Sequence, residues 1–200
     1  MLTALPALLL LAGVATAAPR RAAPFSLETD VLVDVFDGIS VQLRRDHTLV
    51  DHLAVGLAVM RIDIPPYMLD EYNGADPDAW DQIRQIGGRV MLDYHLFEPD
   101  AGLCLGAYVT FDTYRMAREG DAARMWHVGE GVRVGYRWRP GRGRAYVFPA
   151  LAAYHTQKVA GDDVVAGLRF DANVVAPQVM VHIGYTFGRE CPRCSRPTDP

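Results

Sequence analysis

The sequence predicts an all-β protein, an eight-stranded antiparallel up-and-down transmembrane β-barrel, on three observations. Apolar residues alternate with small or polar ones in several segments, most clearly over 179–187, and a period of two gives a strand two unlike faces. The connections between these segments alternate between short and long. An apolar segment at the N-terminus has the character of an export signal. Because a barrel of this size has little room inside for large apolar groups, the apolar face is expected to meet lipid.

The N-terminal segment predicts export. Residues 2–18 are almost wholly apolar, and Ala15-Thr16-Ala17 is a small-x-small pattern that signal peptidase accepts. We therefore predict a signal peptide over 1–18, a barrel domain over 19–187 and a periplasmic tail over 188–200. No Lys or Arg precedes the apolar run, so a retained anchor is the alternative. The run is short for a helix that needs about 20 residues to cross a bilayer, which favours cleavage.

Composition narrows the class of protein. The formal net charge of -4 and the pI near 5.8 argue against nucleic acid as a partner, because phosphate binding needs a concentrated basic surface. Three cysteines are too few for a disulfide scaffold. Cys191 and Cys194 form a CxxC in the tail, for which an accessory disulfide is expected, because a zinc site would need two more ligands.

Alternation and turn residues together predict the strands and their connections. Asp37-Gly38 between the first two segments is a hairpin signal, although one long bent strand is the alternative there. Pro149 removes a ladder donor and predicts a bulge. The predicted strands are 27–36, 39–45, 52–62, 84–96, 103–114, 126–138, 144–155 and 177–187. The short connections are 46–51, 97–102 and 139–143, and the long ones are 63–83, 115–125 and 156–176.

Sorting each strand by parity separates an apolar face from a polar one. The apolar face holds residues such as Leu57, Val132, Tyr146, Phe148 and Tyr154, and the polar face adds small residues to charged ones. A protein core made from the polar set would need extensive pairing, whereas Arg and Asp can pair across a barrel lumen. The sequence therefore predicts a luminal polar network formed by Arg44, Arg89, Asp93, His95, Asp112, Arg133, Arg137 and His182.

Several residues fall outside this pattern. Glu130 shares the apolar parity and is expected near the rim, where a charge costs little. The acidic connection 63–81 is expected to be a solvated loop, with cation binding as the alternative. Arg137, Arg139, Arg142 and Arg144 surround a short turn and are expected to meet anionic headgroups, with ordinary solvated turn charges as the alternative. Aromatic residues are expected to form girdles at the two membrane interfaces, with ordinary strand propensity as the alternative explanation: Tyr67, Tyr72, Trp80, Trp126, Trp138, Tyr154 and Tyr185.

Over residues 27–187 this pattern resembles the small outer-membrane β-barrel proteins of Gram-negative bacteria, the group of OmpA-like, OmpX-like and OmpW-like barrels. The resemblance is sharpest at Val181, Ile183, Tyr185 and Phe187, which are similar to the signal that the barrel-assembly machinery recognises. In that group the signal usually ends the chain, whereas thirteen residues, 188–200, follow it here. The resemblance implies the cell outer membrane as the location, with its lipids and the assembly machinery as partners. It transfers no activity, because the group includes structural proteins, pores and enzymes.

The expected function is a structural, adhesive or small-ligand-binding role with a plugged lumen, without catalysis, cofactor or metal. The six histidines have no metal-ligand spacing. A narrow pore for small solutes is the first alternative. A lipid A or phospholipid hydrolase is another, with His155-Thr156 as its candidate site, although serine occurs only at Ser26, Ser40 and Ser195. A soluble barrel of lipocalin type, with its apolar parity inward, is the last.

Overall fold

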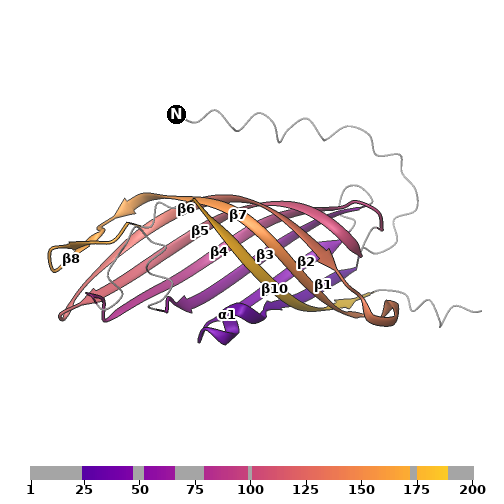
Figure 1. Cartoon of the computed structure of the whole chain (residues 1–200), viewed down its shortest axis with the longest axis horizontal. Coiled ribbons are helices and arrows are strands. Elements are labelled where there is room, and N and C mark those ends of the chain that lie inside the picture. Colours follow the sequence, from indigo (N-terminus) through magenta and orange to yellow (C-terminus); the bar gives the residue numbers. More distant parts are fainter. Residues whose placement is uncertain (1–23, 47–51, 66–78, 99–100, 172–174, 189–200) are drawn as a thin grey trace, which may run out of the picture.

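Eight strands close into an antiparallel barrel in the computed structural model, which describes residues 24–46, 52–65, 79–98, 101–171 and 175–188. The order around the ring is β1-β10-β7-β6-β5-β4-β3-β2, so the predicted fold class is confirmed (Figure 1). The barrel strands are β1 Phe25–Asp30, β2 Ile39–Asp46, β3 Leu53–Asp63, β4 Gln82–His95, β5 Gly102–Arg118, β6 Asp121–Arg137, β7 Ala145–Gly161 and β10 Val175–Phe187.

Some predictions lie outside the described residues. These are the signal peptide over 1–18, Tyr67 and Tyr72, most of the acidic connection, and the tail with Cys191 and Cys194. Among the residues that the structure describes, no helix is long and apolar enough to cross a membrane.

The first predicted strand is wrong beyond Asp30. Residues Val31–Val35 form a short helix, α1, because the Asp30 carboxylate caps it by accepting a hydrogen bond from the Leu32 N–H at 3.1 Å. Asp37, with φ of 56°, then ends the helical segment, so Asp37-Gly38 is not a two-residue hairpin. The pairing of β1 with β10 stops at the Asp30–His182 pair, and α1 contacts β10 beyond it (Figure 1).

Two predicted long connections are shorter than expected. β5 and β6 pair as far as Arg118 and Asp121, and the turn between them is Glu119-Gly120, with φ of 52° and 86°. Positive φ at both turn residues matches the right-handed twist of a hairpin. β7 likewise continues to Gly161, and the next connection contains a second hairpin, β8 Val164–Val165 and β9 Leu168–Arg169.

The predicted bulge is also misplaced. The register between β6 and β7 shifts between Trp126 and His127, not at Pro149. Beside Pro149 the ladder with β6 is interrupted between the Gly135–Ala150 and Trp138–Val147 pairs, but the register is the same on both sides. Proline has no N–H to donate, so it removes a hydrogen bond without inserting a residue.

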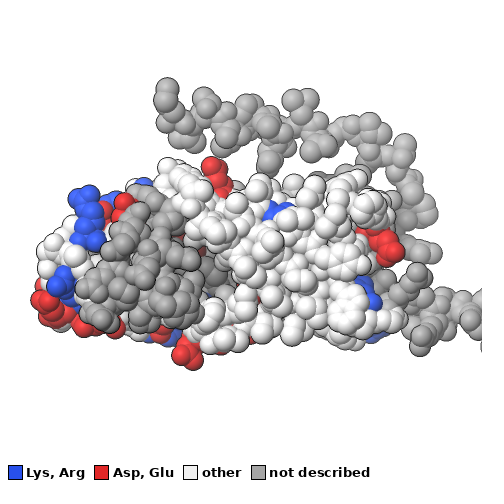
Figure 2. All heavy atoms as spheres, in the orientation of Figure 1, with Lys and Arg blue, Asp and Glu red and all other residues white. Residues whose placement is uncertain are grey.

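The two faces of the wall differ in polarity as the parity predicted, but Glu130, expected near the rim, lies exposed on the outer face near the middle of β6. Outward residues such as Leu57 and Val132 are 57% and 61% exposed, whereas the inward Arg133 is 3% exposed. The visible wall is mostly free of charged residues, which gather toward its two ends (Figure 2). The prediction is wrong for β7, where Tyr146 and Phe148 are buried inside the barrel and Tyr154 is half-buried. Val147 and Leu151 make the outer face of β7 apolar too, so hydrophobicity could not decide its orientation.

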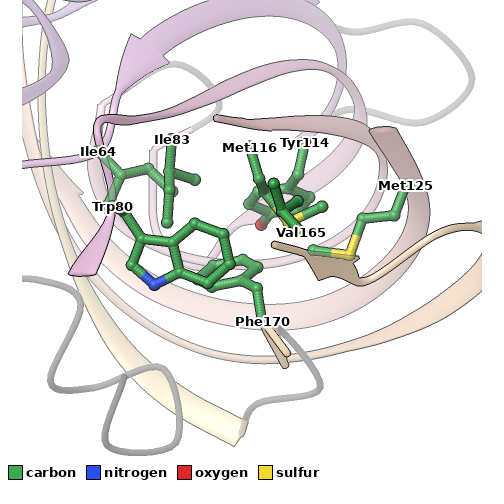
Figure 3. Packing of buried hydrophobic residues seen from close by; sticks show 8 residues of the cluster. All are labelled: Ile64, Trp80, Ile83, Tyr114, Met116, Met125, Val165 and Phe170. Atoms are coloured by element: carbon green, nitrogen blue, oxygen red, sulfur yellow. The ribbon is translucent and has the colours of Figure 1, made fainter. Parts of the chain in front are cut away.

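An apolar cap fills the end of the barrel at which β3 ends and β4 begins, termed here the loop end. The β8–β9 hairpin contributes Val165 to it, and Phe170 follows that hairpin (Figure 3). Trp80 meets Phe170 edge to face, with ring centroids 5.6 Å apart, so Trp80 is not a girdle residue as predicted. The cap consists of Ile64, Trp80, Ile83, Tyr114, Met116, Met125, Val165 and Phe170.

Candidate functional site

Charged side chains from four strands meet inside the barrel toward the end opposite the cap, termed the turn end. They alternate in sign and are all buried. The set is termed the ion-pair network and consists of Glu28 on β1, Arg44 and Asp46 on β2, Asp93 on β4, and Arg133 and Arg137 on β6.

Asp93 joins two guanidinium groups. Its Oδ2 lies 2.9 Å from Nη1 of Arg44, and Arg133 donates to both of its carboxylate oxygens at 2.9 Å and 2.6 Å. Gly106 stands between Asp93 and Arg133 in the register, on the intervening strand. A Cβ atom at Gly106 would overlap Asp93 Oδ1. The lack of a side chain there lets the ion pair form across β5.

Glu28 is the second centre of the network. Arg44 Nε lies 2.9 Å from its Oε1, and the Tyr146 hydroxyl donates to the same oxygen. Gln42 Nε2 donates to Oε2 at 2.5 Å, and His182 Nδ1 lies 3.2 Å from that oxygen. Five polar groups around one buried carboxylate, counting the more distant Arg137 at 3.8 Å, compensate its loss of water.

Arg137 spans the lumen. Its Nη1 lies 3.1 Å from Asp46 Oδ1, and β6 and β2 are opposite strands in the ring of eight. The guanidinium also lies 4.7 Å from the centroid of the Tyr146 ring. Arg139 is buried as well and donates to Thr186 Oγ1 at 2.9 Å. Both arginines therefore face the lumen, and the expectation that the rim cluster as a whole meets headgroups is wrong.

The structure places the eight predicted network residues inside the barrel but does not bring all of them together. Arg89 stacks on Tyr108 at 4.4 Å and reaches Met180 Sδ at 3.3 Å. Asp112 lies beside Gly87, farther toward the loop end. Both ring nitrogens of His95 lack a hydrogen-bond partner among the described residues.

Sequence reasoning missed Glu28 and Asp46. Glu28 lies in the predicted first strand and has the same parity as Asp30. The alternation in that strand could therefore have placed Glu28 inside the barrel. Asp46 was assigned to a turn, whereas β2 includes it and pairs it with Ala54.

Little open space lies between the ion-pair network and the apolar cap. The cavity that Arg89 and Asp112 line has a volume of about 30 Å³, which is room for one or two water molecules. Its other polar lining includes Ser40, Thr110 and His182. Buried side chains of the ion-pair network and of the apolar cap occupy the described interior on either side of this cavity.

The candidate hydrolase residues do not converge. His155 is exposed on the outer wall with Nδ1 4.0 Å from Glu130 Oε1, whereas Thr156 is buried on the inner face. Ser26 and Ser40 also lie inside the barrel. Within the described ranges, no group of three His, Cys, Asp or Glu residues is placed to hold a metal ion.

The C-terminal motif lies on the outer wall at the turn end. Ile183, Tyr185 and Phe187 are exposed, and Val181 is half-buried. The Phe187 ring stacks on Phe25 of β1 with centroids 5.0 Å apart, which joins the first and last strands. Recognition of this motif by the assembly machinery stays a prediction.

Comparisons with known proteins identify a fold and no family. No family model matches the chain, and no curated protein matches it. The crystal structure of a major outer membrane protein from Thermus thermophilus is similar, with a TM-score of 0.52, 14% identity, and coverage of 83% of this chain and 100% of that one. The N-terminal β-barrel domain of Pseudomonas aeruginosa OprF matches with a TM-score of 0.44, 10% identity, and coverage of 84% and 100%. The chain has the fold of outer-membrane β-barrel proteins.

Proposed function

We propose that the protein is a structural, non-conducting β-barrel of the cell outer membrane. The observation that carries the proposal is the filled lumen, in which the ion-pair network closes the turn end and the apolar cap closes the loop end. A solute would have to separate Arg137 from Asp46 on the opposite strand, and the barrel is only wide enough for side chains.

The outer wall supports insertion into a bilayer. Large apolar residues are exposed on all eight strands, and a soluble barrel of lipocalin type would turn them inward. Aromatic rings gather toward the turn end, where an interface with lipid headgroups would favour them. They are Phe25, Tyr94, Phe97, Tyr136, Trp138, Tyr185 and Phe187.

The structural role is favoured over binding of a ligand in the lumen, because the cavity that Arg89 and Asp112 line is too small. A space of about 30 Å³ is far below the several hundred Å³ of ordinary small-molecule sites. The partners that follow from the proposal are outer-membrane lipids around the wall and the barrel-assembly machinery during insertion.

Conductance tests this proposal. Protein reconstituted into planar bilayers is expected to give no steady channel current, because no continuous aqueous path crosses the network. Insertion is checked in the same preparation by the β-sheet circular dichroism of proteoliposomes and by protection from protease. A steady ohmic current from the inserted protein would refute the plugged lumen and favour the narrow pore.

A further inference from the structure

Three arginines lie directly opposite one another on the outer wall near the loop end. The register pairs Arg84 on β4 with Arg115 on β5, and Arg115 with Arg124 on β6. All three have the outward parity, and Arg115 and Arg124 are exposed. This set is termed the arginine row.

Like charges on directly opposite residues destabilise a sheet unless another charge compensates them. Asp63 does so at one end of the row, where Arg84 donates to both carboxylate oxygens at 2.6 Å and 3.2 Å. At the other end the Asp162 N–H donates to the Arg124 carbonyl at 3.1 Å, but no ion pair joins the side chains of these two described residues. Arg115 has a guanidinium neighbour on each side and no carboxylate partner within the described part of the chain. Among the described residues, the centre of the row therefore has no anionic partner.

Two other cations at this end have carboxylate partners of their own. Arg118 pairs with Glu119 at the tip of the β5–β6 hairpin. Lys158 lies 3.0 Å from Asp163 and lowers the pKa of that carboxyl. Arg61 is exposed opposite Ile86 and adds a further positive charge beside the row.

A groove of about 230 Å³ on the wall is lined by this row and by the residues next to it toward the turn end. Its lining is Arg84, Ile86, Thr113, Arg115, Arg124 and Trp126. Ile86 pairs with Thr113, and Thr113 with Trp126, so an apolar and aromatic strip runs parallel to the guanidinium groups. Phe111 is exposed on the wall beyond this strip. Cationic and apolar surface thus meet along one line.

We propose that the arginine row binds the phosphate of an anionic lipid in the outer leaflet, with the acyl chains lying along Trp126, Ile86 and Phe111. The inference rests on the membrane insertion proposed above. Guanidinium groups bind phosphate oxygens in pairs of hydrogen bonds, and a phosphate between Arg115 and Arg124 supplies the missing negative charge. An indole ring beside the headgroup suits the interfacial preference of tryptophan.

Lipid binding by the folded protein in detergent micelles tests the row. Native mass spectrometry would compare phosphatidylglycerol with phosphatidylcholine for wild type, for R115Q/R124Q and for R118Q/R169Q. The control pair removes the same charge at the same end but lies outside the groove. Because each cation near an anionic lipid surface contributes about fivefold in affinity, R115Q/R124Q is expected to bind phosphatidylglycerol about 25-fold more weakly. The control pair is expected to bind it as wild type does.

Equal weakening in both double variants would overturn the site, since only general electrostatics would then act. Equal binding of the two lipids by wild type would overturn it too, and so would displacement of the lipid by inorganic phosphate at the lipid's own concentration. Co-flotation of the wild-type protein with vesicles is measured first, as the test of membrane insertion. Failure to float would count against membrane insertion itself, whereas flotation without the expected loss in R115Q/R124Q would count against the arginine row alone.

Discussion

Replacing Asp93 with Ala is expected to lower the free energy of unfolding by about 3–5 kcal/mol. The change leaves Arg133 without its bidentate partner and removes the second carboxylate of Arg44, while both guanidinium groups stay buried. Urea unfolding in lipid vesicles, followed by tryptophan fluorescence, measures the change.

Asp63→Ala is the matched control, because it breaks an Arg–Asp pair on the same barrel that is partly exposed. Its expected cost is at most about 1 kcal/mol. A second variant, Gly106→Ala, pushes the Asp93 carboxylate out of place without removing a charge, at an expected cost of about 1–3 kcal/mol. Losses below about 1 kcal/mol for Asp93→Ala would show that the network does not hold the barrel closed.

The second large effect is expected from a charge on the outer wall. Val132→Arg is expected to cost about 2–4 kcal/mol, because Val132 lies on the exposed apolar face of β6 and a guanidinium there would have to enter the hydrocarbon region. The readouts are the free energy of unfolding in vesicles and the yield of inserted protein.

Ala122→Arg provides the comparison for depth. Ala122 is exposed beside the β5–β6 turn, so the same substitution there should cost between about 0 and 1 kcal/mol. Val132→Leu controls for the change in shape and should be nearly neutral. An equal cost for the two arginine variants would contradict a lipid-facing wall at Val132.

The sequence predicted most of the ring because most strands have one plainly apolar face. Residues 53–59 alternate so regularly that only one parity can face a polar lumen. The same alternation in β2, β4 and β6 allowed Arg44, Asp93 and Arg133 to be placed inside. β7 lacks this contrast. Its inward Tyr146 and Phe148 fill space beside inward glycines of adjacent strands, Gly184 and Gly135, which only the register reveals.

The ends of the strands were harder to predict than their faces. α1 depends on a capping hydrogen bond that one carboxylate accepts, and the residues of the helix, rich in valine, also suit a strand. The apolar cap draws Trp80 and Phe170 from connections, whose positions no periodicity constrains. The arginine row depends on the register between neighbouring strands. The sequence alone does not show that Arg84, Arg115 and Arg124 lie opposite one another.

Spin-label accessibility tests most directly the central claim that the apolar face meets lipid. Labels would be placed at Leu57, Val132 and Leu151, on three strands, in protein whose three cysteines are replaced by Ala and which is inserted in vesicles. Oxygen is expected to relax these labels far more than a water-soluble nickel complex does, with the reverse at Ala122. Access of the nickel complex to all three wall sites, equal to that at Ala122, would contradict the membrane-embedded barrel.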